Sequence, residues 1–496
     1  MNRTNSNIFM AADTQLSHNV TTGVAWSVAE KIGSALLQAV VSIVVANSIM
    51  PMDMGIMAVL TVFTTLAQVV VDSGFSQTLI RKAQPTDEEY RAVFRFNILS
   101  SLILYALLSI LSPLVSRYYG WPMLATVAPV LFLLLPLNAL CVIQNTIMVR
   151  EFRFAQLSTI TFTASLISGL IAIVMALTGF GIWSLVGQRI SMMAARALML
   201  WWKSSWRPRP TTKASSLSEM APYSLRLMTT DIINALYNNI AQLFIGDIYS
   251  GSVLGYFNQA QKLKDMPVNS TMQSVQSVTF PALSKIGDNE TKFSEGYRRV
   301  VMLTAFIMFP IMAGLIATAE DIYTLLLKPR WHPAIPYFRI LCVVGFFYPI
   351  AVVAYNILKV KSNGGIILRL EIIKKLIMTV ILIVTIPRSV TTIAWGLVVA
   401  AAIEMVLNFS STLKYTTLSV ARFIRTILPI AVITAVMYVV IMVEATYITS
   451  WHVALRLAAK ILTGIITYAS LSFISRTEAF AETLSIVKGF FIKRGK

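Results

Sequence analysis

Charge is scarce in this chain of 496 residues, of which 13% are charged and 56% are hydrophobic. A soluble domain keeps about a quarter of its residues charged, so the composition excludes a soluble globular protein. Mean hydropathy is +0.71, and apolar stretches of the length that crosses a bilayer, about 20 residues, follow one another along the chain. The composition therefore predicts an all-α integral membrane protein.

Cysteine and histidine are also scarce, with two and three residues respectively. Cys141 and Cys342 both fall in apolar stretches, where a thiol packs as a small hydrophobic side chain. So few potential ligands, so far apart, predict no metal site. The first twenty residues are polar and show no pattern of a cleavable signal, so the first apolar stretch, from Gly23, is expected to be a retained span.

Acidic residues are outnumbered by basic ones, 22 against 41, for a net charge of +19. About fourteen spans are predicted, near 23–49, 54–80, 93–115, 123–148, 155–178, 182–202, 220–248, 252–284, 299–327, 334–358, 366–386, 391–413, 423–443 and 452–474. Most basic loop residues lie in every second connection, and the opposite connections hold only Arg117, Lys328, Arg330 and Arg388. Cytoplasmic loops carry the Lys and Arg excess, so both termini are predicted to be cytoplasmic, and the charge requires no nucleic acid.

An internal repeat is predicted with an offset of roughly 200 to 211 residues. Ile49–Gly55 resembles Ile248–Gly255, and Trp121 before one predicted span answers to Trp331 before another. Hydropathy alone makes spans look alike, but it does not place polar and special residues in the same order. Two copies in one orientation would be related by a pseudo-twofold axis along the membrane normal. The predicted parts are a tail (1–21), a six-helix lobe (22–202), a cytoplasmic linker (203–219), a second six-helix lobe (220–413), two further helices (414–474) and a basic tail (475–496).

Polar side chains recur every three or four residues in the first two spans of each copy, which places each set on one helical face. The residues predicted to line a cavity are Gln38, Gln68, Asn234, Asn238, Gln242, Asn258 and Asn269. An unsatisfied polar group in hydrocarbon costs several kcal/mol. The stripes therefore predict a water-accessible central cavity between the two lobes.

Several basic residues at membrane depth have simple explanations. Arg196 and Arg456 lie near enough to span ends to snorkel, and Lys374 can pair with Glu371 at helical spacing. Five others are harder to explain in this way and are predicted to form an anion-binding surface: Lys31, Arg95, Arg189, Lys262 and Lys264. Structural ion pairs are the alternative for each of them.

Four acidic residues at membrane depth leave two interpretations open. They are Glu30, Asp72, Asp231 and Asp265. Each either neutralises a neighbouring cation or binds a proton or cation that is coupled to transport. No cofactor is predicted, and a proton or sodium gradient is the driving force that the second interpretation implies.

Four segments resemble a known family: VDSGFSQTLIRK (71–82), FNQAQKLKDMP (257–267), VTFPALSKIGDN (278–289) and PRWHPAIPYFRILCVVGFFYP (329–349). They are similar to polysaccharide exporters of the PST branch of the multidrug/oligosaccharidyl-lipid/polysaccharide (MOP) flippase superfamily, including Wzx-type O-antigen flippases, and most to the colanic-acid and teichuronic-acid exporters. The resemblance runs from Thr22 to Lys414. It implies two six-helix lobes, fourteen spans, a cationic cavity, an undecaprenyl-diphosphate-linked oligosaccharide as substrate and no covalent chemistry. Met50 departs from the family, in which a basic residue often stands before the proline.

The leading hypothesis is therefore a flippase of the bacterial inner membrane that moves a lipid-linked oligosaccharide outward for surface polysaccharide synthesis, beside a polymerase or other assembly proteins. A cation-coupled drug or solute antiporter of the same superfamily is the alternative, but a cationic drug favours acidic and aromatic walls. A polytopic glycosyltransferase or polymerase is a more distant alternative. Such an enzyme would need catalytic acids in long outer loops, and the predicted outer connections are short.

Overall fold

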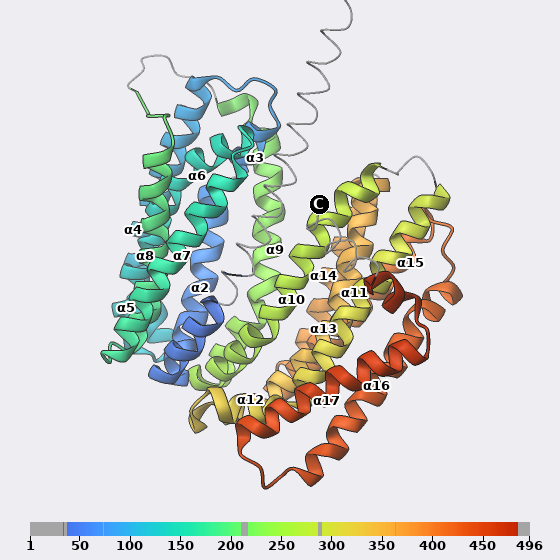
Figure 1. The fold of residues 1–496 in the computed structure, drawn as a ribbon. Helices are drawn as coiled ribbons and strands as arrows, with labels where there is room; N and C mark the ends of the chain where they lie inside the picture. The colour runs from blue at the N-terminus through green and yellow to red at the C-terminus, as the bar shows by residue number, and fades with distance from the viewer. Residues whose placement is uncertain are drawn as a thin grey trace, which may run out of the picture. The chain divides into compact units, whose positions relative to one another are not determined.

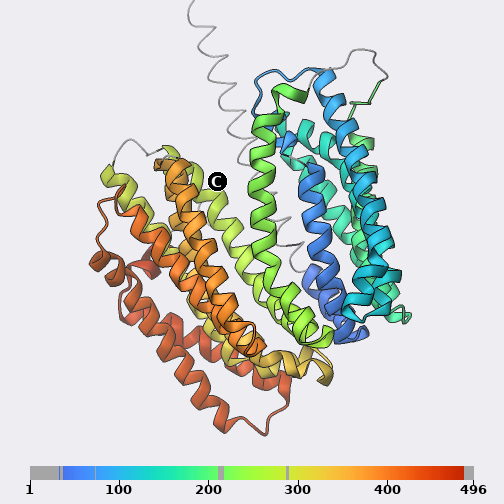
Figure 2. The ribbon, with the colours of Figure 1, turned by 180° about the vertical axis from the view of Figure 1, so that it is seen from behind.

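The structure is a computed structural model that describes residues 33, 37–72, 74–209, 217–285, 290–362 and 364–484. Within these ranges the regular structure is helical and no strand occurs, which confirms the all-α fold class. The chain divides into two compact units, Met1–Gly255 and Tyr256–Lys496. Figures 1 and 2 show the helices of both units from opposite sides.

The first unit begins, in its described part, with a short apolar helix, Leu37–Ser48. The helices that follow are α2 (Pro51–Asp72), α3 (Phe75–Arg81), α4 (Asp87–Tyr119), α5 (Pro122–Phe132), α6 (Leu134–Arg150), α7 (Phe154–Leu177), α8 (Ile182–Lys203), η1 (Leu217–Glu219) and α9 (Ala221–Ile248). α9 packs along α2, and the two run side by side in both views (Figures 1 and 2). α7 packs on α8, and α4 packs on α5 and α6.

The second unit contains most of α10 (Gly251–Lys285), which starts in the first unit. It continues with α11 (Glu290–Ala317), α12 (Ala319–Leu326), η2 (Pro329–Ala334), α13 (Ile335–Lys361), α14 (Gly364–Thr385), α15 (Val390–Thr412), α16 (Val420–Tyr447) and α17 (Val453–Ile474). α13 packs against both α11 and α15. The last two helices form a hairpin that packs on α11, and α17 also contacts α12 (Figure 1).

Local sequence explains where several helices begin. Thr86 and Glu89 form a capping box at the start of α4: the Thr86 hydroxyl accepts from the Glu89 amide at 3.3 Å, and the Glu89 carboxylate accepts from the Thr86 amide at 2.9 Å. Such a box satisfies two of the amides that the first helical turn leaves free. Ser389 and Ser419 cap α15 and α16 in the simpler way, each accepting from an amide three residues later.

Nine helices in the described ranges are long and apolar enough to cross a membrane, so the chain is a multi-pass membrane protein. The remaining long helices, α8, α9, α10 and α14, carry charged and polar residues within their length. A span that faces protein or water can carry such residues. The total of fourteen spans stays a prediction, as do the six proposed parts of the chain.

The predicted span 54–80 is not one helix. α2 ends at Asp72 and α3 begins at Phe75, and between them Gly74 has φ of 68°. Any other residue is strained in this left-handed region. A side chain there would also meet the backbone of Ser224 on α9 at 2.8 Å. An isolated glycine in a helical pattern does not distinguish such a break from a continuous helix, and this one marks a break.

Arg150, at the end of α6, holds the end of α3. Its guanidinium donates to the carbonyl oxygens of Leu79, Ile80 and Lys82 at 2.5, 3.0 and 2.6 Å, and to that of Ala83 at 3.1 Å. The last carbonyls of a helix have no partner within it and favour a cation. Arg150 therefore ties α3 to α6.

The start of α2 crosses the start of α10 at backbone contact. A methyl group at Gly55 would overlap the carbonyl oxygen of Gly251, and one at Gly255 would overlap the carbonyl oxygen of Pro51. Residues 51 and 251, like 55 and 255, are 200 apart in the sequence. The contact is thus reciprocal between equivalent positions of the two predicted copies, as a twofold-related pair would make it.

Candidate functional site

A polar cluster lies inside the first unit, between α2, α6 and α8. The amide of Asn138 on α6 donates to the Asp72 carboxylate at the end of α2, at 3.1 Å. Two helical turns further along α6, the side-chain oxygen of Asn145 accepts a hydrogen bond from the guanidinium of Arg196 on α8 at 3.0 Å. The charges of Arg196 and of Asp231 on α9 both act on Asp72. Four helices therefore contribute to one group of ionisable and amide side chains.

Arg196 has donor capacity left in this cluster. Its Nε is buried and has no hydrogen-bond partner within the described ranges. A guanidinium carries five N–H donors, and a buried donor that stays unpaired costs about 1–3 kcal/mol. The expectation that Arg196 snorkels to the membrane surface is therefore wrong, because its head group binds Asn145 between helices. We infer that the cluster can accept one more hydrogen-bond acceptor or charge.

The predicted stripe on α9 is graded in exposure. Gln242 is buried, Asp231 and Asn234 are half-buried, and Asn238 is exposed. On α2, Gln68 is half-buried, and Gln38 on the short helix before α2 is exposed. The structure brings Asp231 to Asp72, while the other members of these stripes stay predicted cavity residues.

On α10 the structure pairs Asp265 with Lys264. Their charged groups lie 2.5 Å apart, and Lys264 is buried. Lys264 is therefore neutralised by its neighbour in the chain. Lys262, one helical turn before Asp265, is half-buried. Asn258 is half-buried and Asn269 is exposed on the same helix.

Gln259, next to Asn258, was not predicted as a site residue. It is completely buried, and neither amide atom has a partner within the described ranges. A buried amide without partners is unusual. A polar residue at membrane depth is a visible signal, but Gln259 lies off the stripe that periodicity selected.

A second charged cluster joins α14 to α15 and α13. The Lys374 ammonium contacts the Glu371 carboxylate and lies 3.2 Å from that of Glu404. It also lies over the ring of Tyr355, 4.8 Å from the centroid. The predicted pairing of Lys374 with Glu371 at helical spacing is confirmed, and Glu404 adds a third charge from the neighbouring helix.

Within the described ranges, no contact joins the other predicted cations to these clusters. Arg95 on α4 and Arg189 on α8 are both exposed. Lys31 and Glu30 lie outside the described residues. Cys141 and Cys342 are buried, as predicted. In the described ranges no three His, Cys, Asp or Glu side chains are grouped so as to hold a metal ion.

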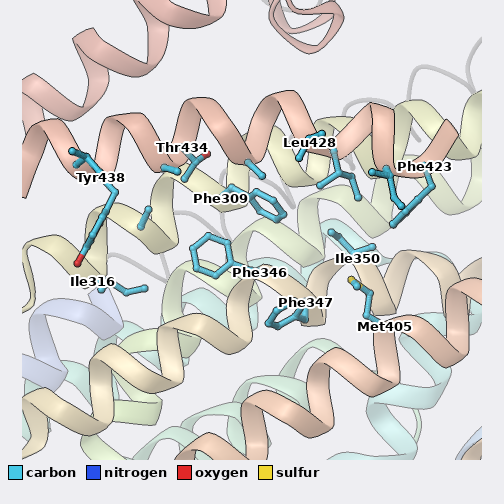
Figure 3. Close-up of a pocket in the computed structure, with 16 residues that line it drawn as sticks. Phe309, Ile316, Phe346, Phe347, Ile350, Met405, Phe423, Leu428, Thr434 and Tyr438 are labelled. Carbon is cyan, nitrogen blue, oxygen red and sulfur yellow. The ribbon is translucent and has the colours of Figure 1, made fainter. Parts of the chain in front are cut away.

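An apolar pocket of about 580 Å³ lies in the second unit, between α11, α13 and α16 (Figure 3). Aromatic rings form much of its wall, and the rings of Phe309 from α11 and Phe346 from α13 lie edge to face, with centroids 5.2 Å apart, beside the part of α16 that carries Leu428 and Thr434 (Figure 3). Met405 closes it from α15. Pockets of this size and composition bind the apolar part of a ligand.

Comparison with known proteins identifies relatives of this chain. A family model described as "Polysaccharide biosynthesis protein" matches residues 44–336. The teichuronic acid biosynthesis protein TuaB of Bacillus subtilis is 21% identical, over 82% of this chain and 85% of its own length. The lipopolysaccharide biosynthesis protein WzxC of Escherichia coli is 23% identical, over 72% of this chain and 73% of its own length.

Solved structures share the fold. The lipid II flippase MurJ in an inward closed conformation superposes with a TM-score of 0.71, at 17% identity, over 91% of this chain and 99% of its own. An inward-facing multidrug resistance MATE family transporter of the MOP superfamily gives a TM-score of 0.59, at 18% identity, over 77% of this chain and 96% of its own. Both likenesses concern the fold alone.

Proposed function

This chain belongs to the polysaccharide biosynthesis protein family, and we propose that it is a flippase that moves an undecaprenyl-diphosphate-linked oligosaccharide across the bacterial inner membrane, from the cytoplasmic to the outer leaflet. The observation that carries the proposal is an apolar pocket of about 580 Å³ in a chain that also carries cations within its helices. An anionic head group on a long apolar chain is the ligand class that needs both.

The head group sets the barrier that such a protein has to lower. A diphosphate carries at least two charges, and transfer of an ion into a low-dielectric core costs several kcal/mol even after relaxation. Lys and Arg side chains in a water-accessible cavity replace the water that the diphosphate loses. Alternating access then exposes the head group to one side of the membrane and afterwards to the other. No covalent bond changes in this cycle.

The isoprenoid chain requires the opposite environment. We assign it to the pocket of α11, α13 and α16, because the wall of that pocket is almost wholly apolar (Figure 3). The chain enters from hydrocarbon and not from water, so the pocket holds it by close packing rather than by a hydrophobic driving force. The names of the relatives, which refer to teichuronic acid and lipopolysaccharide biosynthesis, agree with a lipid-linked glycan as the cargo. The partners would be the carrier lipid and a polysaccharide polymerase, with both termini of the chain cytoplasmic.

The test uses the purified full chain in liposomes that contain a fluorescently labelled polyprenyl-diphosphate sugar. Dithionite quenches only the label in the outer leaflet, so protein-dependent flipping appears as quenching beyond about half of the signal. The same vesicles are tested for uptake of ethidium, a cationic dye. Flipping without ethidium uptake supports the proposal, whereas ethidium uptake without flipping would establish the drug antiporter instead.

A pair of variants on one helix tests the pocket. Ala431 lines the pocket, and Val436, on the same helix, is exposed and is not among the lining residues. Ala431→Trp should fill the pocket and slow flipping at least tenfold, whereas Val436→Trp should leave the rate within about twofold. Equal rates for both variants would exclude this pocket from the transport path.

We further propose that Asp72, Asp231 and Arg196 couple transport to a proton or sodium gradient. The Asp72 carboxylate, which accepts from Asn138 at 3.1 Å, lies within the field of Arg196 and of Asp231. Two carboxylates and one guanidinium leave an excess negative charge that a proton or a cation can neutralise. Asp72→Asn should make the flipping rate independent of an imposed pH or sodium gradient, with Asn138→Ala as the control that keeps the charge. A gradient effect that persists in Asp72→Asn would remove this role.

A further inference from the structure

Another set of charges lies in the second unit, where α12 meets the first turns of α17. The Asp321 carboxylate, 1% exposed, binds two cations of α17 at once: Nε of Arg456 at 2.5 Å from one oxygen and Nζ of Lys460 at 2.5 Å from the other. The side chain of Lys460 is 8% exposed and that of Arg456 22%. Arg456 had been expected to snorkel outward, but it forms part of this triad.

Within the part of the chain that the structure describes, the triad holds two cations and one carboxylate, an excess of one positive charge. The neighbouring acid, Glu320, is engaged by Arg339 at 3.0 Å, so it does not supply the missing negative charge. A cation held at membrane depth costs several kcal/mol unless it is paired. The arrangement therefore favours an added anion close to Lys460 and Arg456.

Lys460 also lines a pocket of about 530 Å³ between α11, α16, α17 and the segment 478–484. Among the described residues that line this pocket it is the one charged side chain, and the rest of their wall is almost entirely apolar. Along α17 the wall continues from Lys460 through Gly464 and Tyr468 to Ala469. Nine residues of α-helix extend about 13 Å, so the pocket is elongated away from its charged end.

The pocket opens on the surface of α17. Ile461 and Ile465 belong to its wall, and yet they are 48% and 62% exposed. In a membrane-spanning helix, apolar side chains that face no protein face lipid. A molecule can therefore enter this pocket from the bilayer.

We propose that this pocket binds an anionic phospholipid, whose phosphate lies at Lys460 and Arg456 and whose acyl chain runs along α17 toward Ala469. The charge excess selects a negative head group, the apolar wall selects an acyl chain, and the exposed mouth selects a molecule of the bilayer. The two pockets share no lining residue and use different faces of α11. The site thus serves another ligand than the proposed cargo, and it fixes α17 to α12 when an anionic lipid is present.

The experiment measures binding of dioleoyl-phosphatidylglycerol and of dioleoyl-phosphatidylcholine to the delipidated full chain, by native mass spectrometry and by thermal unfolding. The expected result is at least a tenfold preference for phosphatidylglycerol and a rise in the unfolding midpoint with that lipid alone. Lys460→Gln should abolish the preference, and Lys460→Arg should retain it. Lys374→Gln, which removes a cation paired with two carboxylates elsewhere in the unit, is the matched control and should bind like the unaltered chain.

Asp321→Asn separates this proposal from a purely structural ion triad. Loss of the carboxylate leaves two cations, so phosphatidylglycerol should bind several-fold more tightly and restore whatever thermal stability the variant loses. A structural triad predicts a loss of stability that no lipid restores. Ala469→Trp keeps all charges and fills the pocket. It should weaken the binding of phosphatidylglycerol without affecting the binding of soluble glycerol phosphate. No preference between the two lipids in the unaltered chain, or an unchanged preference in Lys460→Gln, would overturn the proposal.

Discussion

Replacement of Gly55 by alanine tests the backbone crossing of α2 and α10. In an open helical position this change stabilises a helix by about 1 kcal/mol, because alanine has the higher helix propensity. At Gly55 the added methyl group would overlap the carbonyl oxygen of Gly251. Overpacking in a close-packed interior costs about 1–3 kcal/mol, and backbone cannot rotate aside as a side chain can. We therefore expect net destabilisation of up to about 2 kcal/mol, or roughly 2–4 °C in the unfolding midpoint of a chain of this length.

Gly314→Ala on α11 is the matched control, because a methyl group at Gly314 meets nothing within 4 Å. It should leave the midpoint unchanged or raise it. Gly255→Ala should resemble Gly55→Ala, since its methyl group would overlap the carbonyl oxygen of Pro51. The double variant should lose less than the sum of the two, because the first methyl group already separates the helices.

The assay is thermal unfolding of the purified chain in one detergent, followed by the flipping measurement in liposomes. If the starts of α2 and α10 move together during transport, a methyl group that separates them should change the flipping rate as well as the unfolding midpoint. A midpoint for Gly55→Ala as high as that for Gly314→Ala would refute the close contact of α2 with α10.

Three further outcomes are expected. Lys264→Ala should lower the amount of folded protein in the membrane, as quantified on membrane blots, because it removes the partner of a partly buried carboxylate at a cost of about 1–3 kcal/mol. The double variant Lys264→Ala, Asp265→Ala should recover most of that amount. A cysteine at the exposed Asn238 should react with a water-soluble maleimide in intact cells, while the two buried native cysteines should stay unlabelled. The Arg298 guanidinium, 2.8 Å from the Glu478 carboxylate, holds the pKa of Glu478 below its ordinary value, so their bond should persist at neutral pH and be lost as pH falls below about 4, as hydrogen exchange of 478–484 would report.

The helical membrane fold was predictable because hydropathy reports it directly. In a chain with such long apolar runs, only helices satisfy the backbone hydrogen bonds within lipid. Element boundaries were less predictable. Gly74 divides one expected span with a left-handed backbone, and the residue that it packs against, Ser224, lies far away in the sequence. The glycines of the α2–α10 crossing show the same limit, since their partners are 200 residues distant.

The candidate sites were predictable where partners are neighbours in sequence. Lys374 pairs with Glu371 three residues before it, and helical spacing gives that pair. Arg196 binds Asn145 across 51 positions, and Lys460 binds Asp321 across 139. Neither partner could be found from the sequence, because the spacing of residues on one helix carries no information about the helix that packs against it.

The pairing that the structure does show changes which cation is the strongest candidate for the diphosphate. Lys264 has its charge balanced by the adjacent Asp265 at 2.5 Å, so it offers hydrogen bonds and little net attraction. Arg189 lies about two turns inside α8, is exposed, and forms no ion pair within the described ranges. A guanidinium that faced hydrocarbon at this depth would cost between about 2.5 kcal/mol and several times that. Water or an anion is therefore its favourable surrounding, and its planar fork of donors matches two phosphate oxygens in a way that an ammonium does not.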